Sequence, residues 1–466
     1  MFVPLLLAAA CLDPAPPAAS ERPNVVLIMA DDLGWGDVNY HRDVGGAAGA
    51  WTPHLDALAK DAVRLERFYS ASPVCSPTRA SVMTGRHPHR LGITHANVGR
   101  LPAEEETLAE RLRAAGYATG FFGKWHLGTL TTDRRDANRG RPGNGSDFAP
   151  PWEYGFDVTF ATESKVPTFD PLWKPRVGAR NTWWEPVADP VNAVPYGTAY
   201  WTGPGETAED LRGDDSDLIV NRAAAFIGDA AVAERPFFAV IWFHAPHLPV
   251  VAGAEDAARF APLSDYEKHY RGSVAALDAA VGRVRATLRE AGAADNTLVA
   301  FCSDNGPEGN ATAPGSAGPY RGRKRDLYEG GVRVPGLIHW PAGGLTGGGR
   351  SSLPVVSTDL FPTVLAAAGL EPPTDEGRDG VNLLPLLRSG ATERGGAIGF
   401  TFQNKDAWTE DRYKLIRTKR NAPWELYDLL ADPAEAHDLA ASQPERVERM
   451  ADAFAAWRTT LGPTGR

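Results

Sequence analysis

The sequence predicts an α/β fold: a large, mostly parallel sheet between layers of helices, followed by a small C-terminal α+β subdomain. Apolar segments of strand length, such as 24–30 and 296–302, alternate with helical segments through most of the chain. They are apolar at consecutive positions, as strands of a parallel sheet covered on both faces are. From residue 397 the pattern changes to short strands and a closing helix, 444–461.

We expect three parts in these 466 residues, which are too many for one ordinary core. Residues 1–23 are predicted to be a leader and linker, 24–390 the main domain and 391–466 the small C-terminal subdomain. The apolar start resembles a signal sequence, and Leu-Ala-Ala-Ala-Cys before position 12 is similar to a bacterial lipoprotein cleavage site. We therefore expect export to the periplasm or the extracellular space, with a lipid anchor at Cys11 as an alternative.

Charge and cysteine content exclude several classes of protein. A formal charge of -10 argues against nucleic-acid binding and requires local positive charge wherever an anion binds. No later segment approaches the ~20 apolar residues of a membrane span. The three cysteines are Cys11, Cys75 and Cys302, and we expect no structural disulfide among them.

Taken in order, the helices are predicted from periodicity and end signals. Residues 53–63 follow Thr52 as a possible N-cap, and 107–115 end before Gly116. Residues 210–227 and 264–291 are also periodic, the second over a long amphipathic stretch.

Residues 131–205 lack periodicity and are rich in Pro, Gly and Trp, including Trp152, Trp173, Trp183, Trp184 and Trp201. We expect this long irregular segment to be functional. Its aromatic faces would suit sugar rings, although several of these tryptophans must simply pack.

Polar side chains follow the predicted strands 24–30, 117–122, 236–243 and 296–302. Open α/β sheets bind ligands at the carboxyl ends of their strands, where these side chains would lie. Taken singly, each of these side chains is more typical of a loop or a surface ion pair than of a functional site. In chain order they are Asp31 and Asp32, Lys124 and His126, His247, and Asp304 and Asn305.

Residues 75–86 are Cys-Ser-Pro-Thr-Arg-Ala-Ser-Val-Met-Thr-Gly-Arg. The proline suits the first turn of a helix, which places Cys75 at the helix start and Arg79 four residues along, where it could neutralise an anion. Alone, Cys-x-Pro-x-Arg is as typical of a buried cysteine before a surface helix as it is of a functional site.

Together, Cys-x-Pro-x-Arg, Thr-Gly-Arg at 84–86 and the residues after the strands resemble the type I sulfatases of the alkaline phosphatase superfamily. The arylsulfatase and N-acetylgalactosamine-6-sulfatase-like branch is the most similar. The resemblance extends from Asn24 into the C-terminal subdomain, where Trp-Glu-Leu-Tyr-Asp-Leu at 424–429 is also family-like. It implies an alkaline phosphatase-like fold and sulfuric ester hydrolysis by formylglycine, made from Cys75 by a formylglycine-generating enzyme.

The resemblance also implies the roles of the site residues. Oxygen donors suit Ca²⁺, with Mg²⁺ as the alternative, and the implied metal ligands are Asp31, Asp32, Cys75, Asp304 and Asn305. Lys124 and Lys324 would hold the sulfate oxygens, and Arg79 would steady the formylglycine. His126 would be the base and His247 the acid for the departing alcohol, whereas His244 either touches substrate or packs.

We expect the substrate to be a sulfated small molecule or glycan, with a carbohydrate favoured by the Trp-rich segment and the lack of an apolar membrane element. A phosphonate or phosphate ester hydrolase of the same superfamily is an alternative, because both chemistries move a tetrahedral anion. A non-catalytic sulfated-glycan-binding protein is another, if Cys75 is unmodified. A cysteine hydrolase is disfavoured, because clustered acids would raise the thiol pKa.

Overall fold

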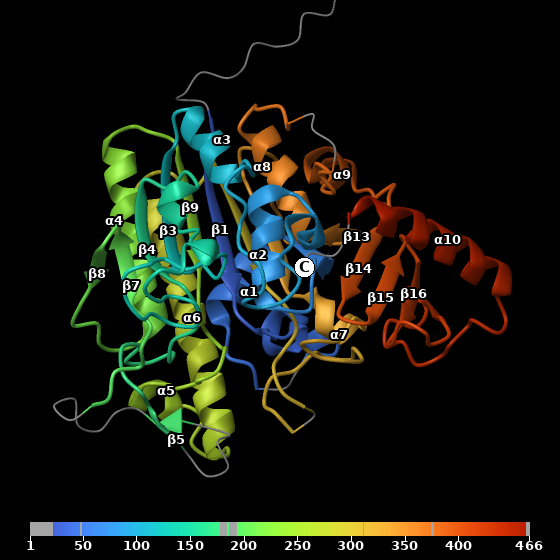
Figure 1. Cartoon of the computed structure of the whole chain (residues 1–466), viewed down its shortest axis with the longest axis horizontal. Coiled ribbons are helices and arrows are strands. Elements are labelled where there is room, and N and C mark those ends of the chain that lie inside the picture. The colour runs from blue at the N-terminus through green and yellow to red at the C-terminus, as the bar shows by residue number, and fades with distance from the viewer. Residues whose placement is uncertain are drawn as a thin grey trace, which may run out of the picture.

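The computed structural model describes residues 22–46, 49–177, 184–185, 193–310, 312–373 and 377–462. The predicted leader, with Cys11, lies outside these residues. A helix-covered main domain and a smaller C-terminal subdomain lie side by side (Figure 1). Among the described residues, no helix combines the length and apolar character needed to span a bilayer.

A large mixed sheet forms the centre of the main domain, in the order β11-β2-β12-β10-β1-β9-β3-β4-β7-β8, with β13 beside β2. The run β10-β1-β9-β3-β4 is parallel throughout. The strands are β1 Asn24–Ala30, β2 Val63–Tyr69, β3 Ala118–Lys124, β4 Val158–Thr162, β7 Tyr200–Gly203, β8 Glu206–Ala208, β9 Phe237–Trp242, β10 Thr297–Ser303, β11 Arg333–Val334, β12 Gly336–His339 and β13 Arg350–Val356. β5 (Arg176–Val177) and β6 (Trp184–Glu185) pair separately.

Helices cover both faces of this sheet, as the alternation along β1 shows. Val25, Leu27 and Met29 belong to one apolar core and Val26 and Ile28 to another. The first core includes α2 (Cys75–Thr84), α3 (Leu108–Ala114), α8 (Leu360–Ala367) and α9 (Leu383–Ser389). The second includes α1 (Pro53–Asp61), α4 (Asp215–Val232) and α6 (Asp265–Glu290), and α5 (Ala254–Ala258) packs on α6. The predicted fold class is confirmed.

The C-terminal subdomain is an antiparallel sheet with a closing helix. Its elements are β14 Ile398–Phe402, β15 Lys405–Thr409, β16 Tyr413–Arg417, β17 Glu425–Asp428 and α10 Pro444–Thr460. Phe400 and Phe402 share an apolar cluster with Tyr69, Val74 and Val332 of the main domain. The short helix α7 (Glu329–Val332) lies in this junction, and the boundary at 390/391 stays a prediction.

Several predicted element bounds were wrong. The helix predicted over 53–63 ends at Asp61, because Val63 begins β2. Thr52 does not cap it with its side chain, which instead accepts from the Asn39 amide at 2.8 Å. Residues 131–205, predicted to be irregular, contribute β4 and β7 to the main sheet.

Candidate active site

The carboxyl ends of the parallel strands bring the predicted polar residues together. Asp31 and Asp32 follow β1, Lys124 ends β3, and Asp304 follows β10. All four side chains are fully buried. Asp32 has a φ of 65°, a left-handed conformation that few residues other than glycine adopt and that is often found at functional sites.

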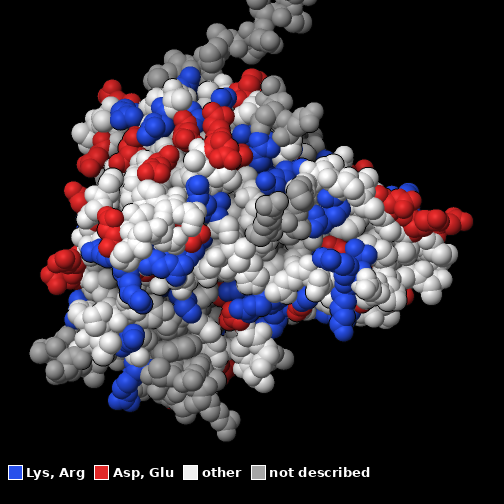
Figure 2. Space-filling model, viewed as in Figure 1, with Lys and Arg blue, Asp and Glu red and all other residues white. Residues whose placement is uncertain are grey.

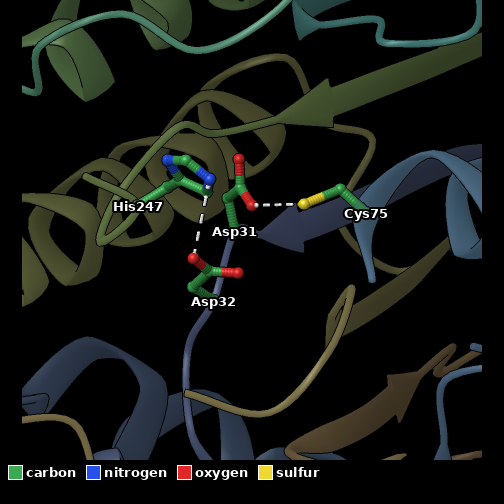
Figure 3. A group of neighbouring side chains, drawn as sticks. All are labelled: Asp31, Asp32, Cys75 and His247. Atoms are coloured by element: carbon green, nitrogen blue, oxygen red, sulfur yellow. Dashed lines mark hydrogen bonds and ion pairs between the residues drawn. The ribbon is translucent and has the colours of Figure 1, made fainter. Parts of the chain in front are cut away.

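Cys75 is buried at the start of α2, with Sγ 3.4 Å from Asp31 Oδ1. Figure 3 shows Cys75 and His247 on opposite sides of the Asp31–Asp32 pair, and the four residues offer ligand atoms that lie within 4.8 Å of one another. Burial, followed by the charges of Asp304 and Asp31, raises the pKa of the Cys75 thiol well above its usual range. An unmodified Cys75 would therefore be a protonated, poor nucleophile, which argues against a cysteine hydrolase.

Each acid of the site has a cationic partner. Lys124 Nζ lies 2.5 Å from Asp31 Oδ2, and Lys324 Nζ lies 2.6 Å from Asp32 Oδ1. Burial would raise the pKa of Asp31, but Lys124, His247, Arg79 and Lys324 together hold it well below its usual range. Asp31 can therefore stay ionised although it is buried.

Arg79 is directed at acids and backbone. Its Nη2 lies 2.7 Å from Asp304 Oδ2, its Nη1 donates to the Lys124 carbonyl at 2.8 Å, and its guanidinium lies 5.2 Å from the centroid of the Trp242 ring. Burial and then Asp31 raise the pKa of Asp304 to about 7, against the opposing charge of Arg79. Arg79 therefore orients Asp304 and the end of β3.

The oxygen donors fit a hard divalent cation. Asn305 Nδ2 donates to Asp32 Oδ1 at 2.6 Å and to the Gly306 carbonyl at 2.9 Å. Its Oδ1 is buried and has no hydrogen-bond partner. A buried acceptor without a partner costs free energy, and a cation shared with neighbouring carboxylates would satisfy it.

A cavity of about 460 Å³ opens above these residues. It is lined by Cys75, Lys124, His126, His247 and Lys324, all of which the sequence predicts as site residues. It is also lined by residues that sequence reasoning missed, and these include His95, Asn97, Asn138, Ser164, Lys165 and Glu308. The local positive charge expected of an anion site is present, although the chain is acidic overall. Figure 2 shows acidic side chains gathered over α3 and at the outer end of α10.

His126 presents an unprotonated nitrogen. Its Nε2 lies 2.9 Å from Asn97 Oδ1, which also accepts from Asn138 Nδ2 at 3.0 Å. Nε2 therefore carries the hydrogen, and Nδ1 is buried with no partner. Burial and then Lys124 lower the pKa of His126 well below its usual range, so the ring is neutral. The backbone of His126 is left-handed, with a φ of 59°, so it does not continue the extended conformation of β3.

His247 and His244 follow the same strand but differ in environment. His247 Nδ1 lies 2.6 Å from the Leu248 carbonyl, Nε2 lies 3.7 Å from Asp32 Oδ2, and burial lowers its pKa to about 4 against the opposing charges of Asp31 and Asp32. His244 is fully buried, with Nδ1 2.8 Å from Asp215 Oδ2. Of the two alternatives for His244, the structure therefore supports packing.

The tryptophans of residues 131–205 that the structure describes do not line this cavity. Its lining within the described residues contains no tryptophan. Trp201 is 2% exposed and donates to Asp136 at 2.9 Å, and Trp152 packs against it and the core. Trp183 lies outside the described residues. Trp152 and Trp201 therefore pack, as expected for several of these tryptophans, and a role of aromatic faces in binding sugar rings stays a prediction.

Comparisons with known proteins agree with this geometry. The family model described as Sulfatase matches residues 23–370, and the model described as N-sulphoglucosamine sulphohydrolase, C-terminal, matches 320–454. N-acetylgalactosamine-6-sulfatase of Homo sapiens is 34% identical over 388 residues, which cover 80% of this chain and 67% of that protein. Steryl-sulfatase of Rattus norvegicus is 33% identical over 417 residues, covering 78% and 70%. A crystal structure of Ps i-CgsB in complex with k-i-k-neocarrahexaose has a TM-score of 0.80 at 29% identity, covering 94% and 92%.

Proposed function

The chain belongs to the sulfatase family and is a sulfatase, and we propose that it hydrolyses the ester of a sulfated carbohydrate with formylglycine made from Cys75 and a bound Ca²⁺. The observation that carries the proposal is the environment of Cys75. Its thiol is kept protonated, yet it adjoins carboxylates, ammonium groups and a neutral imidazole. A site of this kind suits a modified side chain better than a thiolate.

The cation would be held by Asp31, Asp32, Asp304, Asn305 and residue 75. Bound there, it would polarise sulfate oxygens, while the hydrate of formylglycine, formed by addition of water to its aldehyde, would supply the attacking hydroxyl. The buried Asn305 Oδ1 and the oxygen donors support Ca²⁺, with Mg²⁺ as the alternative.

Two lysines would stabilise the charge that develops on the sulfate. Lys124 and Lys324 are buried and each is fixed by a carboxylate, so their ammonium groups need little reorganisation when substrate binds. Fixed charges of this kind favour the transition state over the ground state. Arg79 would contribute indirectly, by orienting Asp304.

Two histidines would move the protons. His126 Nδ1 has a free lone pair in the cavity wall and would accept a proton as the base. His247 would protonate the departing alcohol from Nε2, because Nδ1 is engaged by the Leu248 carbonyl. A bound sulfate ester would add negative charge beside His247 and favour its protonated form.

A carbohydrate is favoured over a steroid by the cavity wall. Asn97, Asn138 and Ser164 offer neutral donors and acceptors that suit hydroxyl groups. One relative is named for an N-acetylgalactosamine sulfate, and one structural neighbour is complexed with k-i-k-neocarrahexaose. Steryl-sulfatase is almost as similar in sequence, so steroid sulfates are the competing substrates to include in a test.

Maturation and export complete the proposal. A formylglycine-generating enzyme would be the partner that modifies Cys75. Residues 1–23 would direct the chain to the periplasm or the extracellular space, with a lipid on Cys11 as the alternative anchor. Peptide masses of the mature N-terminus would identify cleavage or acylation.

The test uses protein co-expressed with a formylglycine-generating enzyme. A peptide spanning position 75 should weigh about 18 Da less than the cysteine form. The panel contains 6-O-, 4-O- and 2-O-sulfated sugars, steroid sulfates, 4-nitrophenyl sulfate and phenyl phosphonate esters. We expect the sugars to be preferred and Cys75→Ala to reduce turnover below about 1% with an unchanged melting temperature. Activity confined to steroid sulfates or phosphonates, or retained by Cys75→Ala, would overturn the proposal.

A further inference from the structure

We propose that Lys165 binds a second anionic group of the substrate, a carboxylate or a second sulfate, beside the ester that is hydrolysed. The inference rests on the proposed function, since it assumes that the cavity binds a sulfate ester. It names the substrate class more narrowly, as a carbohydrate that carries at least two negative groups.

Lys165 differs from the other basic residues of the cavity. Four basic side chains line it, namely Lys124, Lys165, Lys324 and Arg325. Lys124 and Lys324 pair with Asp31 and Asp32, and Arg325 lies 2.6 Å from Glu308. Within the part of the chain that the structure describes, the Lys165 ammonium has no ion pair or hydrogen bond.

The backbone around Lys165 is fixed. The preceding Glu163 is fully buried and pairs with Arg139 at 2.9 Å, while Ser164 Oγ accepts from Asn138 Nδ2 at 2.8 Å. The Lys165 carbonyl accepts from Thr198 Oγ1 at 3.3 Å. Because the segment is already ordered, an anion that binds Lys165 pays little conformational entropy beyond the side chain itself.

No carboxylate near Lys165 is free to neutralise its ammonium group. The side chain is half-buried, and burial followed by the positive charges of Lys124 and Lys324 lowers its pKa. Asp31 and Glu308 oppose this effect, but each is already engaged by another cation. A partly desolvated ammonium without a partner gains from any anion that reaches it.

Lys165 adds a cation at a different point of the cavity wall from the two lysines beside Cys75. It lies three residues beyond β4, the strand that pairs with β3, and Thr162 of β4 lies beside Lys124. Lys124 and Lys324 contact the carboxylates that adjoin Cys75, whereas Lys165 pairs with neither of these carboxylates. Lys165 is therefore free to meet a second substituent, on the same or the next sugar ring, while Lys124 and Lys324 hold the ester.

The test measures binding in the catalytically silent Cys75→Ala background, with Ca²⁺ present, by calorimetry. The ligands are pairs that differ by one anionic group. N-acetylgalactosamine 6-sulfate is compared with the 4,6-disulfate, and the chondroitin 6-sulfate disaccharide is compared with its carboxyl-reduced form. Adding Lys165→Met should weaken the doubly anionic member of at least one pair by about 10- to 100-fold, and its singly charged partner by less than about 3-fold. The pair that responds identifies the second group as sulfate or carboxylate.

Lys60→Met is the matched control, because Lys60 is an exposed lysine of α1 outside the cavity. It should leave all affinities unchanged. The proposal is overturned if Lys165→Met weakens both members of every pair equally, which would place Lys165 at the hydrolysed ester. It is also overturned if neither member responds. Failure of the proposed function would appear separately, as absent turnover by the formylglycine-containing protein.

Discussion

Asn97 Oδ1 accepts a hydrogen bond from His126 Nε2 at 2.9 Å and fixes which nitrogen of that ring is left without a proton. Asn138 Nδ2 donates to the same atom of Asn97 at 3.0 Å, which identifies that atom as the carbonyl oxygen of the Asn97 amide. The base assigned to His126 therefore depends on Asn97, which itself lines the cavity.

Replacing Asn97 should impair proton transfer more than binding. We expect Asn97→Gly to lower kcat by about 10- to 100-fold with a smaller change in KM, because the imidazole loses the acceptor that sets its tautomer, while glycine tolerates the left-handed φ of 63° at this position. Asn97→Asp keeps an acceptor at this position and should retain more of the activity. The measurement is steady-state hydrolysis of 4-nitrophenyl sulfate across pH. Equal losses in both variants would show that Asn97 only supports packing.

Asn305 should contribute directly to cation affinity. Its Oδ1 is buried without a partner, and Asn305→Ala removes that oxygen. We expect the variant to bind Ca²⁺ about 10- to 100-fold more weakly than the unchanged protein, whereas Asn305→Asp keeps an oxygen and should bind Ca²⁺ more tightly than the alanine variant. Calorimetry and the Ca²⁺-dependent rise in melting temperature measure this. A chelator should abolish the rise in the unchanged protein, and equal affinity in both variants would remove Asn305 from the ligand set.

Site residues could be predicted from the sequence where they directly follow a strongly apolar strand. β1 has its predicted bounds, and the carboxyl ends of β1, β3 and β10 meet because neighbouring strands in this run are parallel. Asp31, Lys124 and Asp304 could therefore be placed at one edge of the sheet before any coordinates were known.

Sequence reasoning failed where tertiary contacts decide the outcome. β4 is only five residues long and lies within a Pro- and Trp-rich stretch, so Lys165 at its end had no local signal. Asn97 lies in a loop without periodicity. His244 and His247 follow one strand, and only tertiary contacts distinguish them: His244 is held by Asp215 at Nδ1 and by Thr162 at Nε2, both at 2.8 Å.

Lys414 ties the C-terminal sheet to the helix that follows Lys324. It lies 3.0 Å from Glu329 Oε1 and 2.9 Å from Glu435 Oε1, and all three side chains are fully buried. We expect Lys414→Met to lower the free energy of unfolding by about 3–5 kcal/mol, because the buried Glu435 loses its paired cation and Glu329 is left with Arg333, at 3.3 Å. Urea unfolding measures this, with exposed Lys419→Met as the control that should change it by less than about 0.5 kcal/mol. A comparable loss in the control would contradict the prediction.

His87 should make the junction with α10 sensitive to acid. Its ring is buried with Nε2 unpartnered and packs edge-on against Trp457, with 5.0 Å between centroids. Burial, then His89 and Arg90, lower the pKa of His87 well below its ordinary value of 6.5. In the unfolded chain the ring gains a proton near that ordinary value, but in the folded chain it resists protonation. The stability is therefore fully present above pH 6.5 and is lost as the pH falls below it.

We expect His87 to account for a fall of about 1–2 kcal/mol in the free energy of unfolding between pH 6.5 and about pH 5, since one histidine contributes at most about 1.4 kcal/mol per pH unit. His87→Asn should reduce the pH dependence by that amount, because asparagine does not titrate and its oxygen can accept from the His89 amide as Nδ1 does at 3.4 Å. His437→Asn, at a highly exposed histidine, is the control and should leave the dependence unchanged. If the slope persists in His87→Asn, acid sensitivity arises elsewhere, and His89, whose pKa burial lowers to about 4, becomes the next residue to replace.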